Sequence, residues 1–149
     1  MEILIRDDCP GAGIDEERLR RRLARVLGAL DCDEDTELSV WLCDDPSIQE
    51  LHREYLGEDT PTNVISFAQR EGEFGDLEPE VLGDVVVSVD TARRDAEESG
   101  GALEDEVLFL CIHGVLHLLG YDHEKGQAAR APEMEAKEAE LLRLALDET

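Results

Sequence analysis

Three of the chain's four histidines, His113, His117 and His123, lie within one stretch of eleven residues. His113 and His117 are four residues apart, and an α-helix with 3.6 residues per turn places two such side chains on one face. Gly120 follows three residues later, and glycine readily adopts the left-handed conformation that ends a helix and turns the chain back. We expect this turn to bring His123 toward the two helical imidazoles. The spacing therefore predicts a metal site with three histidine ligands.

Three protein ligands leave one position of a tetrahedral ion open, which is the arrangement of a catalytic metal that lowers the pKa of bound water to about 7. We predict one Zn²⁺ per chain, and another divalent ion such as Ni²⁺ suits the same ligands. A structural metal would usually have a fourth ligand, often a thiolate, and Cys111 points about 160° away from His113 around the helix. Histidines that pack in the core without any metal are the other alternative.

Gly114 stands directly after the first histidine, where the metzincin peptidase signature H-E-x-x-H-x-x-G-x-x-H has its glutamate base. The ligand spacing matches that signature, but the missing carboxylate argues against a peptidase. Water activation is then left to the metal alone, to Asp122 or Glu124 beside the third ligand, or to the phosphate of the substrate. Asp122 could instead orient a ligand imidazole or cap the turn. The catalytic residue is therefore left unassigned by the sequence.

The elements that must position these histidines follow from the spacing of apolar residues. Alternating or β-branched runs predict strands near residues 3–5, 37–42, 64–68 and 84–89. Helical spacing with capping, proline and glycine boundaries predicts helices near residues 16–30, 46–56, 90–99, 103–119 and 132–146. The segment 103–119 is apolar around most of its circumference, which indicates a helix buried in the middle of the domain. Residues 71–80 are typical of a loop.

These elements predict an α/β (α+β) fold with hairpin and crossover connections mixed. We expect a single compact domain over residues 1–149, because this length can bury one continuous core. It would contain a mixed sheet of about four strands and about five helices. The metal site would lie on the central buried helix.

The composition restricts where the chain works and what it binds. It has 14 Lys and Arg against 38 Asp and Glu, and the net charge of −24 repels polyanions, so RNA contacts would depend on a local group of arginines. The four cysteines are far apart and form no C-x-x-C pair, which favours a reducing cytoplasm. No apolar stretch approaches about 20 residues and no basic, apolar leader is recognisable, so we expect a cytoplasmic protein without membrane contact.

The stretch from His113 to His123 reads H-G-V-L-H-L-L-G-Y-D-H. It resembles the hallmark H-G-x-L-H-L-x-G-Y-D-H of the YbeY family of bacterial endoribonucleases. Further segments match the family in the same order: Tyr55 with Gly57 and Asp59, P-T-N-V-I-S-F at residues 61–67, Leu82-Gly83-Asp84, and Met134-Glu135.

The resemblance implies a metal-dependent endoribonuclease that acts on single-stranded RNA. Its family role is ribosomal RNA processing, notably maturation of the 3′ end of 16S RNA in the small ribosomal subunit, together with ribosome quality control. It also implies that His113, His117 and His123 hold the metal, typically assigned to zinc. A ribosomal protein or a GTPase is the kind of protein partner that the resemblance implies.

One position departs from the family. Leu56 stands between Tyr55 and Gly57, where the family usually has an arginine for the substrate phosphate. Leucine cannot make a bidentate phosphate contact, so Arg53, Arg70 or the pair Arg93-Arg94 would have to replace it. Arg53 is favoured, because it lies three residues earlier on the same helix face, although pairing with Glu50 or Glu54 is the simpler role for it.

The missing arginine and the net charge favour one alternative function. In it the chain is a metal-containing ribosome-assembly or binding module with weak or no nuclease activity, and its partners carry the function. A metalloprotease is a third possibility that has the ligand spacing and lacks the glutamate.

Overall fold

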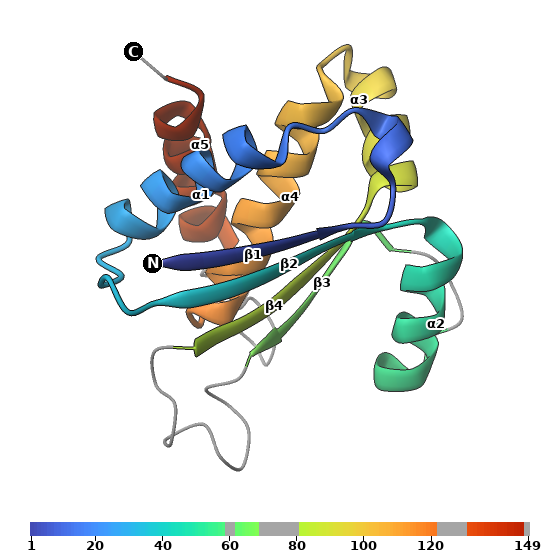
Figure 1. The fold of residues 1–149 in the computed structure, drawn as a ribbon, viewed down its shortest axis with the longest axis horizontal. Coiled ribbons are helices and arrows are strands. Elements are labelled where there is room, and N and C mark those ends of the chain that lie inside the picture. The colour runs from blue at the N-terminus through green and yellow to red at the C-terminus, as the bar shows by residue number, and fades with distance from the viewer. Residues whose placement is uncertain (59–61, 69–80, 122–130, 148–149) are drawn as a thin grey trace.

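The computed structural model describes residues 1–58, 62–68, 81–121 and 131–147 (Figure 1). Its four strands form one sheet in the order β1-β2-β4-β3. β1 (Glu2–Asp7), β2 (Glu37–Cys43) and β4 (Val81–Ser88) are parallel, and β3 (Val64–Ala68) runs antiparallel to β4 at the edge of the sheet. The predicted mixed, four-stranded sheet is therefore confirmed.

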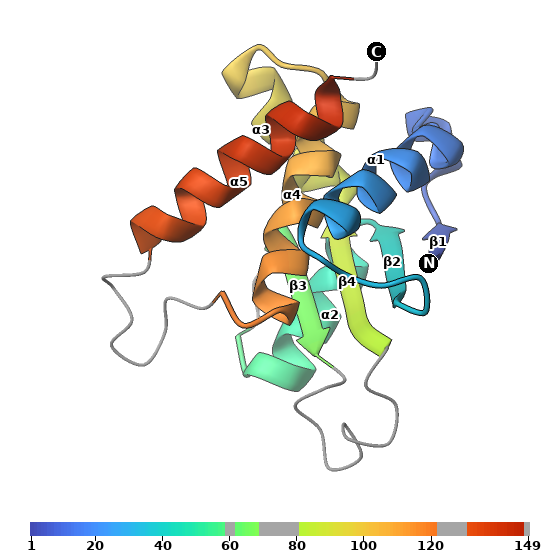
Figure 2. The ribbon, with the colours of Figure 1, turned by 90° about the vertical axis from the view of Figure 1, so that its left-hand side faces the viewer.

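Helices cover the two faces of the sheet unequally (Figures 1 and 2). One face carries α1 (Glu16–Ala29), α3 (Val89–Ser99), α4 (Leu103–Leu118) and α5 (Ala131–Leu146). The other face carries only α2 (Asp45–Leu56), which lies under one end of the sheet. A 3₁₀ turn at Pro10–Ala12 precedes α1. Among the described residues, no helix combines the length and the apolar character needed to cross a bilayer.

α4 is the central helix of the core, as the sequence predicts. Leu108, Ile112 and Leu116 recur at helical spacing and have no exposed surface. They meet the inward side chains of the strands, such as Val40 and Val85, because alternate residues of a strand point to one face. This packing buries the helix on nearly all sides and leaves a narrow part of its surface for polar side chains.

The fourth strand begins and ends earlier than the sequence indicates. β4 spans Val81–Ser88 instead of 84–89. Gly83 has a φ of 139° and lies where the register against β2 shifts, so the glycine permits an irregularity inside the strand instead of starting it. Val89 already belongs to α3, because the Ser88 side chain caps that helix by accepting a hydrogen bond from the Thr91 N–H.

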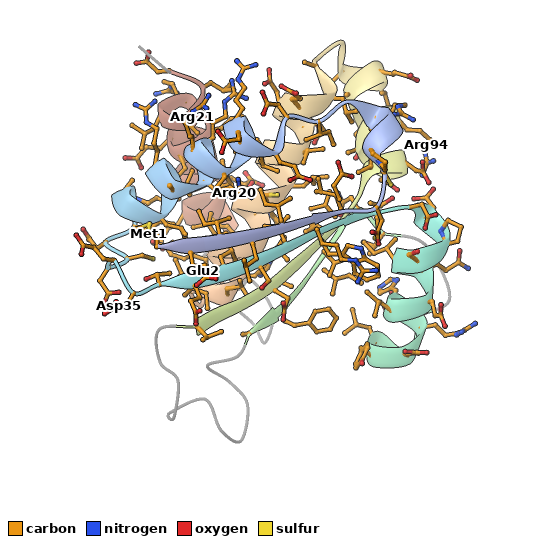
Figure 3. All side chains as sticks on the ribbon, viewed as in Figure 1. Met1, Glu2, Arg20, Arg21, Asp35 and Arg94 are labelled. Carbon is orange, nitrogen blue, oxygen red and sulfur yellow. The ribbon has the colours of Figure 1, made fainter. Side chains whose placement is uncertain are left out.

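Asp45 ties the start of α2 to the start of α3. Its carboxylate accepts hydrogen bonds from Ser88 Oγ at 2.6 Å and Thr91 Oγ1 at 2.7 Å, and Arg94, which lies beside α2 in Figure 3, reaches it at 2.8 Å. Partial burial by itself raises the pKa of Asp45, but these three hydrogen bonds outweigh it and hold the pKa below its usual value. These contacts of Asp45 hold the ends of β2 and β4 together, in addition to the hydrogen bonds of the sheet.

Gly114 brings α4 unusually close to the sheet. A Cβ placed on Gly114 would lie 2.7 Å from Cγ1 and 3.0 Å from Cγ2 of Val85 on β4. Carbon atoms in favourable contact are about 3.5–4.0 Å apart. A side chain at position 114 would therefore enter the sheet, which gives a packing reason why the glutamate of the peptidase signature is absent here.

This contact predicts the effect of Gly114→Ala on stability. Alanine in place of glycine inside a helix normally gains about 1 kcal/mol, whereas overpacking a core costs about 1–3 kcal/mol. We expect Gly114→Ala to lower the free energy of unfolding by about 1–2 kcal/mol in urea denaturation followed by circular dichroism. Val85→Ala should relieve part of this loss in the double variant.

Gly28 on α1 provides the matched control, because nothing lies within 4 Å of a Cβ placed there. Gly28→Ala should stabilise the chain by up to about 1 kcal/mol. Equal stabilisation by Gly114→Ala would contradict the close approach of α4 to β4.

Candidate metal centre

His113 and His117 stand on the part of α4 that the sheet does not cover. Their neighbours Ile112, Gly114 and Leu116 are buried, and both histidines are partly exposed. The two Nε2 atoms are 3.0 Å apart, and the rings meet nearly edge to face with centroids 4.6 Å apart. The four-residue spacing therefore brings both imidazoles together with one nitrogen of each facing the other.

This arrangement fits two ligands of a single ion. Zinc binds imidazole nitrogen at about 2.0–2.1 Å, and two ligands at the tetrahedral angle are then about 3.3 Å apart. The observed separation of 3.0 Å between the Nε2 atoms is slightly shorter than this. A small rotation of either imidazole ring would make up the difference. Within the described residues, no third His, Cys, Asp or Glu joins the pair to complete a three-ligand set.

Glu138 on α5 orients the first histidine. Its Oε1 lies 2.6 Å from His113 Nδ1, and the Glu138 side chain is only 8% exposed. A buried carboxylate accepts hydrogen bonds, so Nδ1–H of His113 is the donor. The proton is thereby held on Nδ1, and Nε2, which faces His117 Nε2, carries the lone pair that a metal ligand needs. A carboxylate behind a ligand histidine is the usual support of such a site.

The end of α4 turns as the glycine predicts. Gly120 has a φ of 95°, its N–H donates to the His117 carbonyl at 3.0 Å, and the Tyr121 N–H donates to the Leu116 carbonyl at 2.9 Å. These two hydrogen bonds form a Schellman motif, which closes a helix and reverses the chain. His123, the third predicted ligand, lies outside the described residues, as do Asp122 and Glu124.

The other candidate ligands lie elsewhere. Burial raises the pKa of the Cys111 thiol to about 12, so it remains protonated in the core. Cys43 is also buried, and no disulfide joins any two of the four cysteines. The fourth histidine, His52, is on α2 and meets Glu58 with 3.1 Å between Nε2 and Oε2. None of these groups joins the histidine pair.

A pocket of about 380 Å³ opens beside His113. It is large enough for part of a small ligand and combines an aromatic ring, an amide and carboxylates. Its lining consists of Asn63, Phe109, Leu110, His113, Met134, Glu135 and Glu138. The pocket gives a ligand direct access to the imidazole of His113.

The candidate phosphate-binding residues are spread over two helices. Arg53 is exposed on α2 and, within the described part of the chain, forms no salt bridge with Glu50 or Glu54. Leu56, at the end of α2, is 59% exposed. Arg94 is paired with Asp45, and its neighbour Arg93 is exposed. Arg70 lies outside the described residues. Arg53 therefore remains a prediction for substrate binding.

Sequence reasoning missed Glu138. The buried positions of α5 are Met134, Glu138, Leu141 and Ala145, which follow one helical stripe. A single carboxylate within an otherwise apolar stripe is a signal that the sequence contains, because an unpaired buried charge is too costly to keep. What the sequence does not contain is the identity of its partner on α4.

The Glu138 contact predicts a loss of metal affinity on mutation. Removing the carboxylate behind a ligand histidine typically weakens metal binding about 10–100-fold, and we expect this for Glu138→Gln, measured by competition with a chromogenic chelator. Glu140→Gln makes the same charge change at a side chain on α5 that is 67% exposed, and its affinity should be unchanged. Equal affinities of the two variants would remove Glu138 from the site.

Comparisons with known proteins agree with this fold and this histidine motif. The family model described as "Endoribonuclease YbeY" matches residues 8–145. A relative of that name from Geobacter sulfurreducens is 53% identical over 131 residues, which cover 88% of this chain and 87% of the relative. A second from Syntrophus aciditrophicus is 48% identical over 141 residues, or 95% and 88% of the two chains.

A solved structure shares the fold. The solution structure of a Thermotoga maritima protein superposes with a TM-score of 0.68 at 27% identity, covering 96% of this chain and 88% of the other. The family match begins just after β1 and runs into α5, so it includes α4 and α5, the helices that carry His113, His117 and Glu138. The chain belongs to the Endoribonuclease YbeY family.

Proposed function

We propose that this chain is a metal-dependent endoribonuclease that cleaves single-stranded RNA with one divalent ion held by His113, His117 and His123. Family membership supports the reaction class, since its curated relatives are endoribonucleases that hydrolyse RNA. The single structural observation that supports the metal centre is the pair of Nε2 atoms 3.0 Å apart, with Glu138 behind His113. A pocket beside His113 leaves room for part of a nucleotide.

A divalent ion at this position would supply Lewis acidity toward a phosphoryl oxygen and an activated water. Glu138 orients a proposed ligand of this ion before the ion binds. Glu138 holds the Nδ1 proton and fixes the ring of His113, so that less reorganisation is needed on binding. The acceptor of the water proton is Asp122, Glu124 or the substrate phosphate, and this remains a prediction.

Zn²⁺ is the proposed ion because three imidazoles leave a tetrahedral site with one open position, and Ni²⁺ suits the same ligands. The proposed substrate is ribosomal RNA, with cleavage at the 3′ end of 16S RNA in the small ribosomal subunit. A ribosomal protein or a GTPase is the proposed protein partner, and the cytoplasm is the proposed location.

Two observations favour the alternative of an assembly module. Leu56 is exposed at the place where the family has an arginine, and the net charge of −24 opposes phosphate binding. In that case the metal site organises the chain, and RNA is bound without being cut. The two following predictions separate the alternatives.

Removal of the metal should abolish cleavage. A chelator, or His117→Ala, should lower cleavage of a short single-stranded RNA by about three orders of magnitude or more, because the metal contributes several kcal/mol to the transition state. Adding back Zn²⁺ should restore the chelated wild type and not the variant. His52→Gln, at the histidine on α2, should keep its metal content. Cleavage that continues unchanged in chelator would rule out this mechanism.

A restored arginine should increase activity. Leu56→Arg places a guanidinium on an exposed position of α2, so stability should be unchanged while kcat/KM rises about tenfold, the value of one charge-assisted hydrogen bond. Leu56→Gln adds a polar side chain without charge and serves as the control. Arg53→Gln should lower kcat/KM by a similar factor. Equal rates in wild type and Leu56→Arg would show that no phosphate contact is made from this helix end.

A further inference from the structure

A pocket of about 650 Å³ lies outside the metal centre, on the opposite face of the sheet. It lies between the open part of the sheet and α2, and its volume is typical of ligand sites. Strand alternation sends Arg6, Trp41 and Phe67 to this side, while Leu51 and Tyr55 approach from α2. Every residue that lines it belongs to the described part of the chain.

Aromatic residues are concentrated in this pocket. The chain has one Trp, two Tyr and three Phe, and three of these six side chains, Trp41, Tyr55 and Phe67, line it. Tyr55 is 64% exposed and meets Phe67 edge to face, with centroids 5.3 Å apart. Large aromatic side chains are normally buried in a core, so their accumulation on an open surface indicates a ligand with flat rings.

The tryptophan is held in one orientation. Its indole N–H donates to the Asp8 carboxylate at 2.7 Å, and the Arg6 guanidinium lies 4.7 Å from the ring centroid. Asp8 also pairs with Arg6 at 2.9 Å. Arginine over an aromatic ring provides a planar, positively charged surface for a base, and a fixed ring loses little entropy on binding.

Charged groups frame the aromatic side chains. Arg20 extends from α1 over β1, where Figure 3 labels it, and its Nε donates to the Ile3 carbonyl at 3.0 Å. Arg6 is the second cation that lines the pocket. Asp84 of β4 contributes a carboxylate to the lining, which can accept hydrogen bonds from the amino groups of bases. Aromatic rings with flanking arginines are the surface that single-stranded nucleic acid recognises with little dependence on sequence.

The edge strand β3 connects this pocket to the metal centre. Asn63, just before β3, lines the pocket beside His113, and Phe67, near its end, lines the aromatic pocket. The four residue-to-residue steps from Asn63 to Phe67 span about 13 Å of extended chain. A flexible single-stranded nucleic acid that passes over the β3 edge can therefore reach both faces of the sheet.

We propose that the pocket of Trp41, Tyr55, Phe67 and Arg6 is a base-stacking platform for the part of a single-stranded RNA that flanks the scissile bond. This proposal rests on the proposed function for the identity of its ligand. The RNA crosses the β3 edge, with its phosphodiester at His113 on one face and its neighbouring bases on the aromatic side chains of the other. Stacking supplies binding energy that an acidic surface cannot obtain from phosphates.

Trp41 is the chain's single tryptophan, so its fluorescence reports on this pocket alone. The metal-loaded full chain is titrated with a phosphorothioate single-stranded RNA of roughly 12 nucleotides, a length within the range that single-strand-binding domains cover. Saturable quenching is expected with the single strand and not with a duplex of the same sequence. Bound RNA that leaves the fluorescence unchanged, as judged by anisotropy of labelled RNA, overturns the proposal.

Two variants test the pocket independently of Trp41. Tyr55→Ala removes an exposed ring and should raise the Kd for the single strand about tenfold without loss of folding. Leu144→Ala changes a side chain on α5 that is 38% exposed and lies outside the pocket, and its Kd should be unchanged. Equal Kd values for wild type and Tyr55→Ala overturn the proposal and leave the pocket to another kind of ligand.

Cleavage assays separate this proposal from the proposed function. Tyr55→Ala should keep its metal content and its kcat while its KM for RNA rises. Metal-dependent cleavage without Trp41 quenching would leave the nuclease assignment intact and eliminate the platform. Trp41 quenching without metal-dependent cleavage would support the platform and eliminate the nuclease assignment, since the RNA would then be bound and not cut.

Discussion

The contact between Gly114 and Val85 determines where the histidine pair stands. Because no side chain separates α4 from β4 at this point, the helix lies deep in the core, with Leu108 and Ile112 fully buried. Only a narrow face of α4 is then left for polar groups, and His113 and His117 occupy it. The same contact explains why this helix has the ligand spacing of a peptidase without its base, since position 114 points into the sheet.

The site depends on a second helix for its electrostatics. Burying a carboxylate without a partner is costly, and Glu138 is almost fully buried. Its partner is the Nδ1–H of His113, so α5 is held against α4 by one polar contact within an apolar stripe that contains Met134 and Leu141. Among the acidic residues that the structure describes, Glu138 is the one buried in the core, where it contacts His113.

The sequence predicted the elements better than the contacts between them. Periodicity was sufficient for α4 and for the histidine pair, because spacing along one helix fixes both. It was wrong about the start of β4, since Gly83 lies within an irregular strand. Glu138 and the aromatic pocket were not found, because both arise from packing between distant segments. Trp41 and Phe67 are ordinary strand residues until the sheet order places them on one face.

The hydrogen bond between α5 and His113 also links two equilibria. An ion that binds only the folded chain stabilises it by an amount that grows with the logarithm of ion concentration. Glu138 contacts His113 and lies on the last helix, so binding of the proposed ion to His113 would be coupled thermodynamically to the docking of α5. If the proposed ion binds at this pair, a cell that withholds it would shorten the lifetime of the protein, and the surviving molecules would be enriched in the metal-bound form.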